Sequence, residues 1–231
     1  MTRKVCFLIS LSLLSLNLQA KECVILLHGL AKSNRDMVKL EKALVKEQFY
    51  PVNFDYPSRD YPIETLATQA IESSVERCNQ ADKVHFVTHS MGGILVRYYL
   101  KNHVIPNLGR VVMLGPPNQG SDAADAYRNF PGYKFIAGPA GFQLGTGNLS
   151  IPKQTGAANF ELGIIAGSRS INLILSAILP GKDDGKVTVE STRLDGMSDH
   201  ITLPVTHPFM MKNREVINQV IYFLKNGKFQ S

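Results

Sequence analysis

Short apolar runs alternate with amphipathic stretches along most of the chain. Runs of strand length occur at residues 23–27, 51–54, 83–88 and 110–114. Stretches with apolar residues at helical spacing occur at residues 33–48, where Ser33 is expected to cap the helix, 62–78 and 91–101. Strands that alternate with helices of these lengths predict an α/β protein, in which a mostly parallel sheet carries helices on both faces.

The second half of the chain adds two shorter apolar runs and a closing helix. Residues 162–166 and 201–203 bring the expected sheet to about six strands. Residues 213–225 form an amphipathic pattern, and Gly227 just past it is typical of a helix C-terminus.

Residues 115–160 interrupt this alternation. They hold eight of the eighteen glycines and five of the twelve prolines, and they show almost no periodic apolar face. A connection of this length inside a compact domain is usually functional. We therefore predict an irregular cap or substrate-binding segment over the carboxyl edge of the sheet; the alternative is a well-packed irregular loop.

The first twenty residues have the pattern of a signal peptide. Arg3 and Lys4 precede an apolar core, and Ala20 is a suitable cleavage site. The apolar run is too short to span roughly 30 Å of hydrocarbon as an anchor. We expect an exported protein, periplasmic or secreted, whose single domain is residues 21–231.

Two cysteines, Cys23 and Cys78, remain after this cleavage. In an oxidising compartment they predict a disulfide between the start of the first strand and the end of an early helix. The alternative is a pair of buried free thiols.

Composition excludes two classes of partner. The formal net charge of +6 includes Arg3 and Lys4, and no basic stripe with interleaved aromatic residues is present, which argues against nucleic-acid binding. No cluster of cysteine and histidine has metal-ligand spacing, so we expect no metal and no cofactor.

Ser90 lies in the stretch VHFVTHSMGG, residues 84–93, in which an apolar run meets a serine and then small residues. This pattern predicts a strand, a tight turn and a helix N-terminus, with the hydroxyl at the apex near backbone N–H groups. A serine there needs a base and an acid to become a nucleophile.

Candidates for both follow later in the chain. Asp183 and Asp184 precede Gly185, and His207 lies in a loop after the last strand. The order nucleophile, acid, base is that of one serine-triad fold and differs from the two other well-known ones. His28 and Gly29 end the first strand, where a tight turn directs a backbone N–H toward the same edge.

Four motifs in register, VILLHGL at 24–30, VTHSMGG at 87–93, DGKV at 184–187 and TH at 206–207, resemble small bacterial lipases and esterases of the α/β-hydrolase superfamily. The resemblance implies a minimal α/β-hydrolase fold. It also implies that Ser90 is the nucleophile, His207 the base and Asp184 the acid. The N–H groups of Leu30 and Met91 would form the oxyanion hole, with His28 and Gly29 supporting its loop.

Several residues compete for these roles. Asp183 is the alternative acid and His200 the alternative base, whereas His89 is expected to be a packed core residue. Tyr56 is an alternative lining residue of an acyl pocket, as are four aromatic residues of the cap: Phe130, Tyr133, Phe135 and Phe142.

One position departs from the common Gly-x-Ser-x-Gly elbow, because Thr88 stands where the first glycine is usual. A threonine fits this turn if its side chain points away from the following helix, with Gly92 and Gly93 leaving space on the other side.

The function expected from these features is hydrolysis of carboxylic esters of small molecules or lipids, with transient contact with a lipid interface. An acyltransferase or thioesterase with the same triad is the first alternative. A non-catalytic member that uses the cleft for binding is the second.

Overall fold

A parallel sheet of six strands organises the protein, in the order β2-β1-β3-β4-β5-β6. The computed structural model describes residues 22–171, 176, 179 and 181–231, so the expected signal peptide at 1–20 lies outside the described residues. All five neighbouring pairs are parallel, as predicted. The strands are β1 (Glu22–Leu27), β2 (Tyr50–Phe54), β3 (Lys83–His89), β4 (Leu108–Leu114), β5 (Leu162–Gly167) and β6 (Asp199–Leu203).

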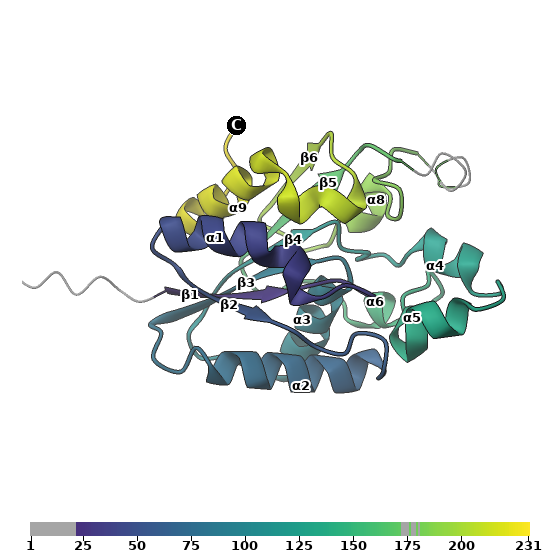
Figure 1. The fold of residues 1–231 in the computed structure, drawn as a ribbon, viewed down its shortest axis with the longest axis horizontal. Coiled ribbons are helices and arrows are strands. Elements are labelled where there is room, and N and C mark those ends of the chain that lie inside the picture. Colours follow the sequence, from purple (N-terminus) through teal and green to yellow (C-terminus); the bar gives the residue numbers. More distant parts are fainter. Residues whose placement is uncertain (1–21, 172–175, 177–178, 180) are drawn as a thin grey trace, which may run out of the picture.

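Helices cover both faces of this sheet (Figure 1). Side chains of β1 alternate between two buried clusters, with Ile25 and Leu27 in one and Val24 and Leu26 in the other. This alternation follows from the two-residue period of a strand and explains why residues 23–27 of β1 are all apolar. The first cluster packs under α2 (Ile63–Glu76) and α3 (Met91–Asn102), and the second under α1 (Val38–Lys46) and α9 (Arg214–Asn226).

The first helix differs from its prediction at both ends. Ser33 precedes a 3-10 turn, η1 (Asn34–Met37), and its side chain makes no capping hydrogen bond. The Asp55 carboxylate instead accepts the Asn34 N–H at 3.0 Å, which supplies the acceptor that a cap would have given. The α-helix ends at Lys46, and Gln48 has a positive φ of 68°.

Residues 115–160 contain three short helices beyond the carboxyl edge of the sheet (Figure 1). The helical spacing is hard to detect because Gly138 breaks α5 with φ 58° and ψ −170°. A Cβ at Gly138 would lie 1.8 Å from the carbonyl oxygen of Arg59, so this close approach requires glycine. The helices are α4 (Asp122–Tyr127), α5 (Tyr133–Phe142) and α6 (Ile151–Gln154).

Arg97 on α3 binds this segment to the body of the protein. Its buried guanidinium donates to the backbone carbonyl oxygens of Asn118, Pro152 and Gly156 at 2.8–3.0 Å, and to Asn118 Oδ1 at 3.1 Å. Burial lowers the pKa of Arg97 to about 10. A lone arginine inside an apolar helix face gives no sequence signal for this role.

Arg97→Ala is expected to lower the free energy of unfolding by about 3 kcal/mol or more, because it leaves several buried carbonyl groups without a donor. Urea unfolding measures the loss. Lys101→Ala is the control, since Lys101 lies one turn later and its exposed ammonium donates to Gln154 O at 2.9 Å. Equal losses in the two variants would contradict the role of Arg97.

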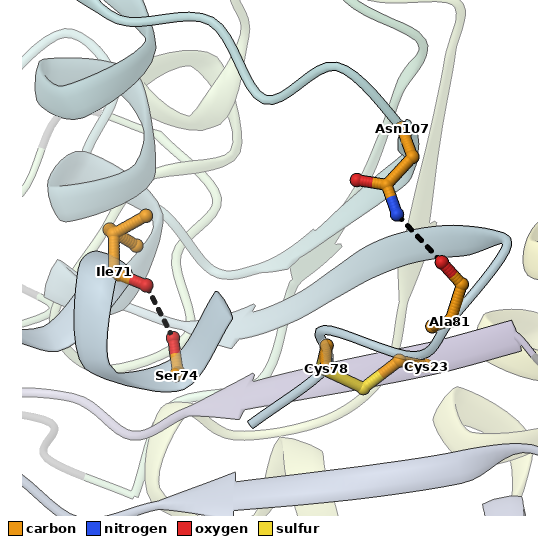
Figure 2. The surroundings of a disulfide bond; sticks show 6 residues. All are labelled: Cys23, Ile71, Ser74, Cys78, Ala81 and Asn107. Atoms are coloured by element: carbon orange, nitrogen blue, oxygen red, sulfur yellow. Dashed lines mark hydrogen bonds between the residues drawn. A yellow bond between two sulfur atoms is a disulfide. The ribbon is translucent and has the colours of Figure 1, made fainter. Parts of the chain in front are cut away.

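Cys23 and Cys78 form the predicted disulfide, with their Cα atoms 5.8 Å apart (Figure 2). It links β1 to the turn after α2, at the amino edge of the sheet. Close by, Asn107 donates a hydrogen bond to the carbonyl oxygen of Ala81 at 2.8 Å. The cross-link therefore lies at the edge opposite the cap segment.

Candidate active site

Ser90 occupies a sharp turn between β3 and α3. Its φ of 54° and ψ of −123° are rarely adopted by residues with a side chain. Two backbone hydrogen bonds hold the turn, from Ser90 N to Leu114 O at 2.9 Å and from Gly93 N to Ser90 O at 3.0 Å. Backbone strain of this kind concentrates at functional sites, so Ser90 is a candidate functional residue.

Gly92 allows the start of α3 to lie against the end of β1. A Cβ at Gly92 would lie 2.7 Å from Leu27 O and 2.9 Å from His28 O. Because both contacts are with backbone, no side chain fits there.

Thr88 corrects one expectation about this turn. Its side chain is fully buried, and its Oγ1 would lie 3.2 Å from a Cβ on Gly93. The threonine therefore faces α3 instead of pointing away from it. In the common elbow, glycine at the position of Thr88 leaves space between strand and helix. Here Gly93, which has no Cβ, leaves that space on the helix side.

Asp184 and His207 form a buried pair. The carboxylate is fully buried, and its Oδ2 accepts a 2.7 Å hydrogen bond from His207 Nδ1. Its Oδ1 accepts from the N–H groups of Lys186 and Val187 at 3.0 and 2.9 Å. Because an ionised carboxylate only accepts, His207 must carry its proton on Nδ1, which leaves Nε2 as a base.

The competing acid and base have other partners. Asp183 accepts from Gly185 N at 2.7 Å and from Ser176 Oγ at 2.5 Å. His200 lies in β6, and its Nε2 bonds to Thr192 Oγ1 at 2.9 Å, near the end of α8 (Val189–Thr192). The structure thus brings Asp184, and not Asp183, onto His207.

His89 is buried as expected, but it also supports the loop that carries His207. Its Nε2 lies 3.0 Å from the carbonyl oxygen of His207, and the ring centroids are 4.7 Å apart. Burial and the nearby His207 hold the pKa of His89 well below its usual value. A neutral His89 therefore donates from Nε2 to this carbonyl, at the first residue of η2 (His207–Lys212).

Gly115 is a site residue that the sequence reasoning missed. It follows β4 with a φ of 53°, and a Cβ there would lie 2.9 Å from Asp184 Oδ2 and 3.1 Å from His207 Nδ1. Only glycine leaves room for the Asp184–His207 hydrogen bond. A glycine directly after a strand was the available signal, but seven other glycines follow it in the cap segment.

The two expected oxyanion donors come from different segments, Met91 directly after Ser90 and Leu30 from the loop after β1. Met91 is the first residue of α3, and the first N–H groups of a helix have no acceptor inside it. Leu30 follows β1 and lines the same cavity as Ser90. A Cβ at Gly29 would lie 3.0 Å from Ser90 Cβ, so Gly29 lets this loop approach the serine.

His28 and Tyr56 stabilise the loop after β1 through contacts with each other. Their rings stack with centroids 4.1 Å apart, and Tyr56 Oη donates to His28 O at 2.5 Å. Burial lowers the pKa of His28, which favours the neutral ring. Tyr56 is thus a buried partner of His28 and not a lining residue of an acyl pocket, which corrects that expectation.

A cavity of about 470 Å³ is lined by Ser90, His89 and His207, among other residues. Its apolar wall comes from residues 117–144 and includes Phe130 and Tyr133. Phe135 and Phe142 do not line it, and Phe135 is 86% exposed. Ser90 and His207 both line this cavity, and among the described residues no hydrogen bond joins Ser90 Oγ to His207 Nε2. Such catalytic hydrogen bonds are often long in free enzymes.

The described residues hold no candidate for two other kinds of site. No group of three or more histidine, cysteine, aspartate or glutamate residues described by the structure is arranged to hold a metal ion. None of the described helices is long and apolar enough to cross a membrane.

Known proteins with similar sequence or structure identify the family. The model of the alpha/beta hydrolase family matches residues 24–169. Mature lipase BlEst2 from Bacillus licheniformis superposes with a TM-score of 0.69 at 21% identity, over 89% of this chain and 93% of that one. No curated protein sequence matches the chain.

Two further structures share the fold. Phospholipase PlaB from Legionella pneumophila has a TM-score of 0.68 at 16% identity, over 90% of this chain and 59% of that chain. An esterase from Pyrococcus furiosus has a TM-score of 0.62 at 17% identity, over 90% and 82%. With the family model spanning more than half its length and the six-stranded parallel sheet, the chain belongs to the alpha/beta hydrolase family.

Proposed function

We propose that the protein is a serine hydrolase of carboxylic esters, with Ser90 as nucleophile, His207 as general base and Asp184 as the acid that orients His207. One observation carries the proposal. Asp184 and His207 form a buried 2.7 Å hydrogen bond, and His207 lines the same cavity as Ser90. The likeness in fold to a lipase and an esterase supports the ester class.

The reaction follows from these positions. Ser90 Oγ attacks the ester carbonyl carbon while its proton passes to His207 Nε2, and the imidazolium is stabilised by the Asp184 carboxylate. The N–H groups of Leu30 and Met91 stabilise the oxyanion. His207 then protonates the departing alcohol, and water activated by His207 hydrolyses the acyl-enzyme.

The cap segment is proposed to hold the acyl chain. Its apolar side chains form one wall of the cavity, and several of its large apolar residues are also exposed. Phe130, Ile136 and Leu149 are 62%, 64% and 87% exposed. Exposed apolar residues beside a binding cavity favour transient contact with a lipid interface.

Export is part of the proposal. The disulfide between Cys23 and Cys78 supports it, because such bonds persist in the periplasm or outside the cell and are rare in the cytosol. The expected leader at residues 1–20 supplies the route.

The test is a series of p-nitrophenyl esters from acetyl to palmitoyl, with Ser90→Ala as the blank for background hydrolysis. We expect turnover that varies with chain length, and a fluorophosphonate probe that attaches to the peptide containing Ser90. A protein that cleaves no ester and leaves Ser90 unlabelled would contradict the proposal. Labelling of Ser90 excludes a role limited to ligand binding.

A further inference from the structure

The charged side chains that line the Ser90 cavity are all basic. Lys32 and Lys186 line it, and apart from His207 its other described lining residues are apolar or uncharged. No aspartate or glutamate is among the described residues that line it. The Asp184 carboxylate is fully buried behind His207 and is already bound by it.

Both lysines extend from the turns that build the site. Lys32 lies two residues after Leu30, and its N–H donates to Gly29 O at 3.3 Å. Lys186 lies two residues after Asp184, and its N–H donates to the Asp184 carboxylate at 3.0 Å. The backbones of both lysines are therefore fixed relative to Ser90 and His207.

The two ammonium groups are only partly neutralised. Lys32 Nζ lies 3.6 Å from Asp36, but Asp36 also pairs with Lys212 at 3.0 Å. Lys186 takes part in no ion pair among the residues that the structure describes. Lys32 and Lys186 line the same cavity, so their like charges repel each other across it. An anion between them would relieve that repulsion.

Most of the apolar lining and the two lysines come from different parts of the chain. The apolar wall comes from residues 117–144, whereas the basic side chains come from the loops after β1 and before α8. An acyl chain on the apolar wall leaves the alcohol or thiol part of a substrate for the basic side.

We propose that Lys32 and Lys186 select substrates that carry a phosphate or another anionic group on the alcohol or thiol side of the scissile bond. The proposal rests on the ester hydrolysis proposed above and specifies its substrate class. A phospholipid headgroup and the phosphates of coenzyme A share this chemistry, and the experiment separates them.

The test uses matched substrates that differ in the anionic group. One pair is 1-octanoyl-glycerol-3-phosphate and 1-octanoylglycerol; the other is octanoyl-coenzyme A and S-octanoyl-N-acetylcysteamine. All are assayed as monomers at low salt. In the pair whose anionic group corresponds to that of the natural substrate, we expect kcat/KM to be about tenfold higher for the anionic member. This preference should shrink as salt screens the charges.

The variants locate the effect. In Lys32→Gln/Lys186→Gln, the anionic substrate should lose roughly tenfold in kcat/KM relative to its neutral partner. Lys42→Gln/Lys46→Gln removes the same two charges from the exposed surface of α1, away from the cavity, and should keep the wild-type ratio.

Each outcome decides a different question. A wild-type ratio near one in both pairs, or an unchanged ratio in the double variant, overturns the selection by the lysines while ester hydrolysis stands. No Ser90-dependent turnover of any substrate, neutral ones included, overturns the proposed function itself. A preference in the lipid pair alone identifies a phosphate headgroup, and one in the thioester pair alone identifies coenzyme A.

Discussion

Asp184→Asn is expected to lower kcat for ester hydrolysis by about 10⁴-fold with little change in folding. The asparagine oxygen still accepts from the N–H groups of Lys186 and Val187. Its amide nitrogen, however, meets His207 Nδ1 where the carboxylate oxygen accepted a hydrogen bond. His207 must then hold its proton on Nε2, and in that tautomer it cannot remove the proton of Ser90.

Asp183→Asn is the matched control. Its oxygen can keep the hydrogen bond to Gly185 N, and its amide can donate to Ser176 Oγ, so both hydrogen bonds of residue 183 are kept. The bond between Asp184 and His207 is not altered. Steady-state kinetics and urea unfolding are measured on both variants. If Asp183→Asn loses more activity than Asp184→Asn at equal stability, the acid has been assigned to the wrong residue.

Gly115→Ala is expected to lower kcat/KM by roughly 100-fold, because a displaced base loses the alignment that its proton transfer requires. The new Cβ would lie 2.9 Å from Asp184 Oδ2, 3.0 Å from Met210 Sδ and 3.1 Å from His207 Nδ1. Both members of the pair are buried, so one of them must move. The positive φ adds about 1 kcal/mol of strain to the folded state.

Gly181→Ala separates strain from displacement. Gly181 also has a positive φ, of 93°, but it is exposed and a Cβ there would have no neighbour within 4 Å. This variant should lose similar stability and keep its activity. Equal activity in the two variants would show that Gly115 does not shape the site.

The strands were predictable because parallel strands between two layers of helices are buried on both faces. Residues 23–27 are apolar throughout and residues 84, 86 and 87 are apolar for this reason, and neither run, 23–27 or 83–88, is offset by more than one residue from its strand. The cap helices were not predictable in the same way. In α5 a glycine breaks the helical path where Arg59 approaches, and that contact joins segments far apart in the chain.

The candidate site divides in the same manner. The motifs around Ser90, Asp184 and His207 are local, since a turn and its flanking strand are written in consecutive residues. Gly115, His89 and Arg97 act through neighbours that are distant in sequence, and their residue types are common in unrelated roles. No local pattern distinguishes them.

The sequence by itself determined the six-stranded α/β architecture, the tight turn at Ser90 and the order of the candidate triad, because periodicity and local motifs indicate them. For Cys23 and Cys78 it predicted a disulfide but left two free thiols as the alternative, and the structure joins them. Only the tertiary structure decided which aspartate meets His207, that Thr88 faces α3, that Tyr56 packs on His28, and that two lysines line the Ser90 cavity. These are contacts between elements, and the packing of the whole sheet and its helices fixes them.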